Sequence, residues 1–273
     1  MHRYRGTTAL VTGASKGLGR AYAQELARRG AHLVLVARSA PALERLASEI
    51  RAEHHVDTRV IGADLSDPAG PTAVAEELHR QGVAVDLLVN NAGLGSVGPF
   101  FTRPLAQQVR SVDVNVNGLM LMTRLIGAGM LERGSGGIIN VASTAAFQPM
   151  PYQASYAATK AFVLSFSEAL TAELRGTGVH VMAAHPGATD TGFFDHTTAV
   201  MDAKRTDSPT RVAAKTLDDF ARGRTASYPG RPLFRASTWP VRFLPRTTVT
   251  RMTAGLNRHM GFHEAQDVGT PAG

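Results

Sequence analysis

Short apolar runs alternate with longer segments of helical periodicity along the first two thirds of the chain. Runs such as Leu-Val-Leu-Val are apolar on both faces, as a strand buried in a parallel sheet requires. Six such runs have the length of a strand and are predicted to form one: residues 7–12, 32–37, 58–62, 85–89, 137–142 and 179–184. The segments predicted to be helical are residues 18–29, 41–54, 71–81, 105–131 and 156–175.

This alternation predicts an α/β protein, a doubly wound parallel sheet of the Rossmann fold with helices on both faces. Later in the chain, Ser208 and Pro209 predict the cap and first turn of a helix over 208–222, and residues 225–228 predict a final strand. We expect a single domain over 1–273, with a substrate-loop region at 190–205. Residues 231–273 form a C-terminal extension whose last ten residues are expected to fray.

Composition is that of an ordinary globular protein, with 44% hydrophobic and 19% charged residues in 273. The absence of cysteine excludes disulfides and thiol catalysis. The N-terminus lacks the apolar core of a signal peptide, and no run approaches the ~20 apolar residues of a membrane span. We therefore expect a cytoplasmic protein that begins at or near Met1.

The formal net charge of +7 comes mainly from arginine, much of it between Lys204 and Arg258. A basic half can bind nucleic acid or a membrane surface, but an Arg-rich solvated surface is the simpler interpretation. We expect no nucleic-acid partner, and keep membrane contact through the basic tail as an alternative. We also expect no metal, because His259 and His263 lack an evident third ligand.

Tyr156 and Lys160 stand four residues apart on a predicted helix and project from one face. An ammonium beside a phenol stabilises the phenolate, so we expect Lys160 to lower the Tyr156 pKa from ~10 toward neutrality. Such a tyrosine exchanges protons at working pH. Ser143 ends a predicted strand, at the sheet edge where ligands bind in open α/β folds. The alternative is a chance Tyr-x-x-x-Lys spacing.

A glycine-rich turn joins the first strand to the first helix. Glycine lets backbone N–H groups approach a pyrophosphate at a helix N-terminus, although an ordinary turn is the alternative. The residues assigned to cofactor binding here are Gly13, Ser15, Lys16, Gly17, Leu18 and Gly19.

Arg38 follows the second strand, where an acidic residue would bind the ribose 2′-OH of NAD. A guanidinium suits a 2′-phosphate instead, and Lys16 adds a second positive charge. We therefore expect NADP(H). The alternative is that Arg38 is a surface residue capping the next helix.

Polar residues also follow the third and fourth strands. Asp64 and Leu65 come after the third strand, and an aspartate there can bind an adenine amino group. Asn90-Asn91-Ala92-Gly93 comes after the fourth strand. The asparagine pair could line the cleft or tie neighbouring strands together, and we expect both.

With these motifs in family order, the sequence resembles the short-chain dehydrogenase/reductase family over residues 6 to about 230. The matching segments are TGASKGLG (12–19), Asp64, NNAG (90–93), VNVNG (114–118), Ser143, YAATK (156–160) and PGATDT (186–191). The resemblance implies a catalytic tetrad of Asn115, Ser143, Tyr156 and Lys160. Tyr156 would be the general acid and Ser143 would polarise the carbonyl. Lys160 would hold the nicotinamide ribose, and Asn115 would bind a proton-relay water.

The same resemblance implies cofactor contacts beyond the glycine turn, from Asn91, Ala92, Gly93, Tyr156, Lys160, Pro186, Gly187, Thr189 and Thr191. It implies hydride transfer between the nicotinamide and a ketone or secondary alcohol. A catalytically silent NADP(H)-binding regulatory or sensor protein is the alternative. Family members of this kind are expected to be homodimers or homotetramers.

The substrate pocket is expected to be apolar, so a bulky or apolar ketone is favoured over a sugar. Its assigned residues are Leu94, Phe147, Met150, Phe193 and Phe194, with Ser143 and Tyr156. The extension carries Phe234, Trp239, Phe243 and Leu244. Because exposing such side chains is costly, we expect them to pack over the cleft or against a partner subunit.

Overall fold

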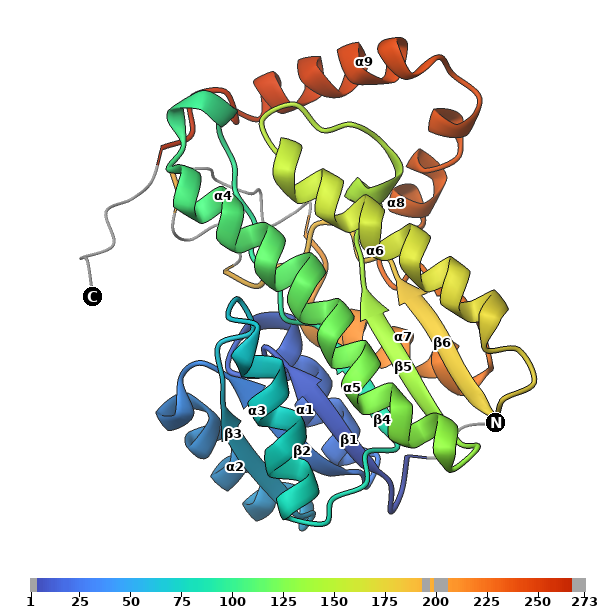
Figure 1. Ribbon diagram of the computed structural model, residues 1–273. Coiled ribbons are helices and arrows are strands. Elements are labelled where there is room, and N and C mark those ends of the chain that lie inside the picture. Colours follow the sequence, from blue (N-terminus) through green and yellow to red (C-terminus); the bar gives the residue numbers. More distant parts are fainter. Residues whose placement is uncertain (1–3, 193–196, 199–205, 267–273) are drawn as a thin grey trace.

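A seven-stranded parallel sheet forms the centre of the molecule (Figure 1). The structure, a computed structural model, describes residues 4–192, 197–198 and 206–266. The strand order β3-β2-β1-β4-β5-β6-β7 places the topological switch between β1 and β4. The strands are β1 (Thr8–Thr12), β2 (His32–Ala37), β3 (Thr58–Gly62), β4 (Leu87–Asn90), β5 (Gly136–Val141), β6 (Val179–Ala184) and β7 (Ala226–Ser227).

Helices cover both faces of this sheet, which confirms the predicted doubly wound fold. Alternate residues of each strand point to opposite faces, so Leu33 and Leu35 pack in one core cluster and Val34 and Val36 in the other. The helices are α1 (Gly17–Arg28), α2 (Ala40–His54), α3 (Ala69–Arg80), α4 (Leu105–Val112), α5 (Leu119–Glu132), α6 (Ala154–Glu173), α7 (Pro209–Ala221), α8 (Pro232–Ser237) and α9 (Arg246–His259).

The helix predicted over 105–131 is interrupted by a π-helical segment, Asp113–Gly118, between α4 and α5. Such wider turns inside α-helices are often found at functional sites. Gly118 lets the helix pass close to the loop after β3, because a Cβ there would lie 2.4 Å from the Leu65 carbonyl oxygen. The segment brings Asn115, which is buried, to the end of β4.

Together these segments form a helical stretch, Leu105–Glu132, that is long and apolar enough to cross a membrane by length and composition alone. Half of its apolar window is buried inside the chain, as expected for a helix that packs on its own core. On the outer side of this stretch an apolar stripe is nevertheless exposed to solvent; it consists of Leu105, Val109, Val112 and Met120.

The C-terminal part of the chain folds into an arm, residues 231–266, which contains α8 and α9. Figure 1 shows α9 lying beyond the carboxyl ends of β5 and β6. Thr253 Oγ1 donates to the Pro149 carbonyl (2.9 Å), and Asn257 Nδ2 donates to the Pro151 carbonyl (2.7 Å). These bonds fix α9 to the loop that leads into α6.

Two expectations for this arm need correction. Fraying does not begin at Glu264, because Ala265 is buried beside Phe262 and Gln266 pairs with the main chain of residue 198. The aromatic side chains also behave differently from one another. Phe234 is half-buried, whereas Trp239 is 57% and Phe243 80% exposed. Packing within the chain is therefore wrong for the last two, since the arm is attached through its other face.

Candidate active site

Ser143, Tyr156 and Lys160 come together at the carboxyl end of β5. Ser143 comes two residues after the strand, while Tyr156 and Lys160 lie in the first two turns of α6. The Ser143 hydroxyl lies beside the Tyr156 phenol. Lys160 Nζ lies 5.9 Å from the centroid of the Tyr156 ring. The structure thus assembles the three groups that the sequence singled out.

Burial is the largest cause of the pKa shifts of Tyr156 and Lys160. Burial raises the pKa of the Tyr156 phenol, and the hydrogen bond with Ser143 opposes that rise. Burial also lowers the pKa of Lys160 to about 8. The expected lowering of the Tyr156 pKa by Lys160 is therefore wrong for this structure. The ammonium instead donates to the Val141 carbonyl at 2.7 Å.

Asn115 holds the loop after β4 in place. Its Oδ1 accepts from the Leu94 N–H (2.8 Å), and its Nδ2 donates to the Leu94 carbonyl (2.8 Å) and to Thr159 Oγ1 (2.9 Å). Gly93 lies between this amide and the lysine, because a Cβ there would be 3.3 Å from Asn115 Oδ1 and 3.6 Å from Lys160 Nζ. Both amide hydrogens of Asn115 are engaged, so the predicted relay water would have to donate to an oxygen of this residue.

The glycine turn at the start of α1 fits a dinucleotide. Gly13 and Gly17 have φ values of +67° and +55°, which side chains other than glycine rarely adopt. A Cβ on Gly19 would lie 2.1 Å from the Gly13 carbonyl oxygen. Side chains are thus excluded from the N-terminus of α1, whose N–H groups and positive dipole end suit a pyrophosphate.

Two exposed cations stand beside this turn. Lys16 follows β1 and Arg38 follows β2, and these strands are neighbours in the sheet. Arg38 does not cap α2, because Ser39 Oγ accepts the Ala42 N–H there. Both cations therefore remain at the sheet edge where the resemblance places the adenosine ribose.

Asp64 lies at the carboxyl end of β3, but protein groups occupy both of its carboxylate oxygens. One accepts from the N–H and hydroxyl of Ser66, and the other pairs with Arg110. Partial burial acts to raise the Asp64 pKa, yet these partners hold it below its ordinary value. Leu18 and Leu65 turn their side chains into the core, which leaves main-chain groups for any cofactor contact.

The loop over 186–191 connects the two ends of the candidate dinucleotide site. The Pro186 carbonyl accepts from the Thr144 N–H (3.0 Å), next to Ser143. Farther along, Thr191 lies against the glycine turn, because a Cβ on Gly17 would be 3.0 Å from its Cβ. Thr189 Oγ1 donates to the Gly187 carbonyl (3.1 Å).

Sequence reasoning missed Asp207, which supports this loop together with Phe234. The Asp207 N–H donates to the Ala188 carbonyl (2.9 Å), and the Asp207 carboxylate accepts from the Arg231 N–H (3.0 Å). The Phe234 ring fills the space beside Gly187, where a Cβ would lie 2.3 Å from it. The C-terminal arm is thereby fixed to the loop. No local motif marks Asp207, since its role depends on the loop being nearby in space.

Three of the residues predicted for the substrate pocket, Leu94, Phe147 and Met150, are half-buried. The Phe147 ring packs on His185 (5.0 Å between centroids) and Tyr228 (6.0 Å). The predicted Phe193 and Phe194 lie outside the described residues.

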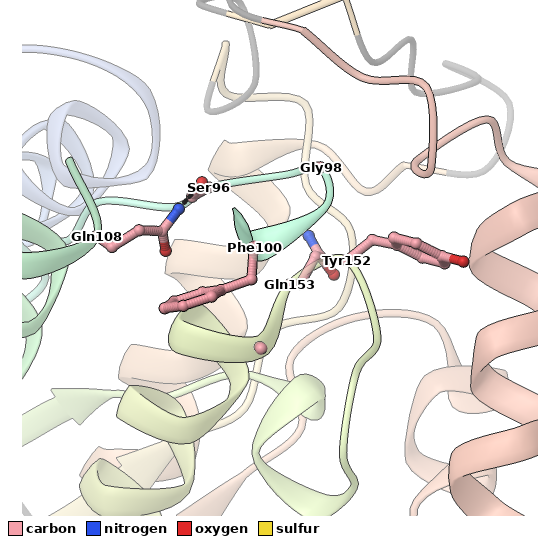
Figure 2. Close-up of a pocket in the computed structure, with 7 residues that line it drawn as sticks. Ser96, Gly98, Phe100, Gln108, Tyr152 and Gln153 are labelled. Carbon is pink, nitrogen blue, oxygen red and sulfur yellow. Dashed lines mark hydrogen bonds between the residues drawn. The ribbon is translucent and has the colours of Figure 1, made fainter. Parts of the chain in front are cut away.

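A small cavity of about 20 Å³ lies next to the start of α6. Figure 2 shows Gln108 of α4 directed at Ser96, to which it donates a 2.7 Å hydrogen bond, and the Tyr152 ring directed away from them. None of its lining residues was predicted from the sequence; they are Ser96, Gly98, Phe100, Gln108, Tyr152, Gln153 and Ala154. The amides of Gln108 and Gln153 and the Ser96 hydroxyl make the lining of this cavity partly polar.

Comparison with known proteins settles the family. The family model for short chain dehydrogenases matches residues 7–201. The chain belongs to the short-chain dehydrogenase family. A short chain dehydrogenase of Pseudocercospora fijiensis is 37% identical over 188 residues, which are 68% of this chain and 60% of that protein. This chain thus spans less than two thirds of that relative. A very-long-chain 3-oxoacyl-CoA reductase of Anas platyrhynchos is 31% identical over 261 residues, 93% of this chain and 81% of that protein.

Solved short-chain dehydrogenases share the same architecture. A Sphingobium yanoikuyae member in complex with NADPH has a TM-score of 0.78 and 31% identity, covering 98% of both chains. The bulky-bulky ketone specific alcohol dehydrogenase of Comamonas testosteroni has a TM-score of 0.74 and 31% identity, covering 88% of this chain and 95% of that chain.

The lowered Lys160 pKa predicts how stability depends on pH. Below pH 8 Lys160 is charged in both the folded and unfolded states, so the cost of burying the charge is fully present. Between pH 8 and the ordinary value of 10.5, the folded chain releases a proton that the unfolded chain keeps, and stability rises with pH. The free energy of unfolding of the wild type, relative to that of Lys160→Met, should therefore rise by on the order of 2–3 kcal/mol between pH 7 and pH 10. Urea unfolding of both proteins measures this, and a difference that stays constant with pH would contradict it.

Proposed function

We propose that this short-chain dehydrogenase is an NADP(H)-dependent oxidoreductase acting between a ketone and a secondary alcohol. The observation that carries the proposal is the Ser143–Tyr156 pair beside the buried Lys160 ammonium, next to the Pro186 loop. A catalytically silent cofactor sensor would not need this buried lysine, whose charge is costly to keep in the fold.

In the proposed reaction, each residue has a role that follows from its position. NADP(H), when bound, supplies or accepts the hydride. The glycine turn would hold its pyrophosphate, and Lys16 and Arg38 its 2′-phosphate. In reduction, Ser143 orients the carbonyl oxygen and Tyr156 donates a proton to it. Because burial raises the Tyr156 pKa, the phenol is protonated and ready to donate at neutral pH.

An apolar or bulky ketone is the substrate class we propose. Leu94 and Met150 are apolar and half-buried, and the main chain of Leu94 is hydrogen-bonded to Asn115. The names of two similar proteins, one acting on very-long-chain 3-oxoacyl-CoA and one on bulky-bulky ketones, support the same class. Oxidation of the matching alcohols belongs to the same proposal.

Tyr156→Phe removes the proton donor and keeps the ring. We expect turnover of any accepted ketone to fall at least ~100-fold, as for loss of a general acid, while NADPH binding is kept. Steady-state kinetics with fluorescence titration of NADPH separates these two effects. Phe162→Leu, a change on the same helix away from the tetrad, is the control. Near wild-type turnover in the Tyr156 variant would mean that another group donates the proton.

Arg38→Ala tests the choice of cofactor. We expect the free energy of NADPH binding to become less favourable by about 1.5–3 kcal/mol, as for a lost charged hydrogen bond. The affinity for NADH should change little. Arg45→Ala, an exposed arginine on α2, is the matched control. Titration of each protein with both cofactors measures the difference. An equal loss for the two cofactors would show that Arg38 does not bind the 2′-phosphate.

We further propose a homodimer or homotetramer that covers the apolar stripe on α4 and α5. Leu105 is 69% and Val109 50% exposed, one helical turn apart. The double variant Leu105→Glu/Val109→Glu should therefore elute as a smaller species in size-exclusion chromatography with light scattering. Leu256→Glu on α9 should leave the assembly unchanged. Loss of assembly in the Leu256 variant alone would place the contact on the arm instead.

A further inference from the structure

The positive charge of this protein is concentrated near its C-terminus. From Phe220 to His263 there is no Asp, Glu or Lys, and eight arginines: Arg222, Arg224, Arg231, Arg235, Arg242, Arg246, Arg251 and Arg258. The whole chain has 29 Lys and Arg against 22 Asp and Glu, so removing these eight leaves 21 against 22. This one segment therefore accounts for the entire basic excess.

The arm also exposes large apolar side chains, which are Leu233 (74%), Trp239 (57%), Phe243 (80%), Leu244 (38%), Met252 (62%) and Leu256 (54%). On α9 the inner side is formed by Val249 and Asn257, which are buried. Met252 and Leu256, one turn apart, lie on the exposed side. The arm thus offers aromatic and aliphatic side chains to the surroundings, mixed with arginine and without any carboxylate until Glu264.

Several of these arginines are available to a partner. Arg222 and Arg224 pair with Asp219, and Arg231 pairs with Asp207. Within the described part of the chain, Arg246 and Arg251 make no ion pair, and Arg235 lies over the Tyr228 ring at 5.5 Å. A symmetric contact with a second copy would place the same patch against itself, so arginines would face arginines. Charge complementarity therefore favours an anionic partner. The exposed aromatic and aliphatic side chains favour one with an apolar interior, which is a lipid surface rather than a nucleic acid.

The arm lies beside the cleft and is fixed to both of its sides. α9 is bonded to the loop over 149–152, which leads to Tyr156, and Phe234 packs on Gly187 of the loop after β6. We propose that the arm binds the surface of an anionic membrane. Trp239, Phe243 and their apolar neighbours enter the headgroup region, and the arginines pair with lipid phosphates. The cleft then lies at the lipid surface, where apolar substrates dissolve.

Trp239 is the single tryptophan of the chain and reports on this contact directly. Vesicles of phosphatidylcholine with about 30% phosphatidylserine should shift its fluorescence to the blue, because the indole leaves water. Pure phosphatidylcholine vesicles should shift it at least ~10-fold less at equal lipid concentration, and about 1 M salt should reverse the shift. This readout does not depend on turnover, so it is separate from the proposed enzymatic function.

Variants test the residues. In vesicle co-sedimentation, Arg246→Gln/Arg251→Gln should weaken binding by about 10-fold or more, from roughly 1 kcal/mol per arginine near an anionic surface. Phe243→Ser should also weaken it. Arg45→Gln and Phe101→Ser, an exposed arginine and an exposed phenylalanine far from the arm in sequence, should bind as the wild type does. For each variant, NADPH should raise the melting temperature by as much as it does for the wild type, which establishes that the variant is folded.

Three results would overturn the proposal. The first is a Trp239 spectrum that vesicles leave unchanged. The second is equal binding to neutral and anionic vesicles, which would remove the role of the arginines. The third is a blue shift that grows with protein concentration in the absence of lipid, which would assign the arm to a second copy of the chain.

Discussion

The hydrogen bonds that join Thr12 to the turn after β4 hold the site together. Thr12 Oγ1 accepts from the N–H groups of Asn91 (3.0 Å) and Ala92 (2.9 Å), and Asn91 Nδ2 donates to the Thr12 carbonyl (3.0 Å). This junction lies at the topological switch of the sheet, where the connections diverge and leave a crevice. It fixes the glycine turn on one side and, on the other, the start of the loop in which the Leu94 N–H donates to Asn115 Oδ1.

At the candidate active site, burial has a larger effect than neighbouring charges on the ionisation of the side chains. Burial lowers the pKa of Lys160 and raises that of Tyr156, so both groups are moved toward their neutral forms. A neutral phenol suits a proton donor, and the 2.7 Å hydrogen bond to the Val141 carbonyl offsets part of the cost of the buried ammonium. Burying Lys160, whose ammonium lies 5.9 Å from the centroid of the Tyr156 ring, therefore costs the fold stability below pH 8.

Most of the fold could be predicted from the sequence, because buried parallel strands and amphipathic helices produce strong periodic patterns of apolar residues. Strand bounds differed by two residues at most, and the nearness of Tyr156 to Lys160 followed from their spacing on one helix. The π-helical segment at Asn115 could not be predicted, since it changes hydrogen-bond register without breaking the apolar pattern. Asp207 and the exposure of Trp239 depend on contacts between distant segments, which periodicity does not record.

Transfer of deuterium from NADPH labelled at nicotinamide C4 tests the central claim most directly. The labelled cofactor would be incubated with the protein and a panel of bulky aryl and alkyl ketones, and the products analysed by mass spectrometry. We predict that deuterium appears on the carbinol carbon of at least one product, in step with the loss of NADPH absorbance. A protein that binds NADPH tightly but leaves it unoxidised with every ketone would contradict the account, and would instead be a cofactor-binding sensor built on the same fold.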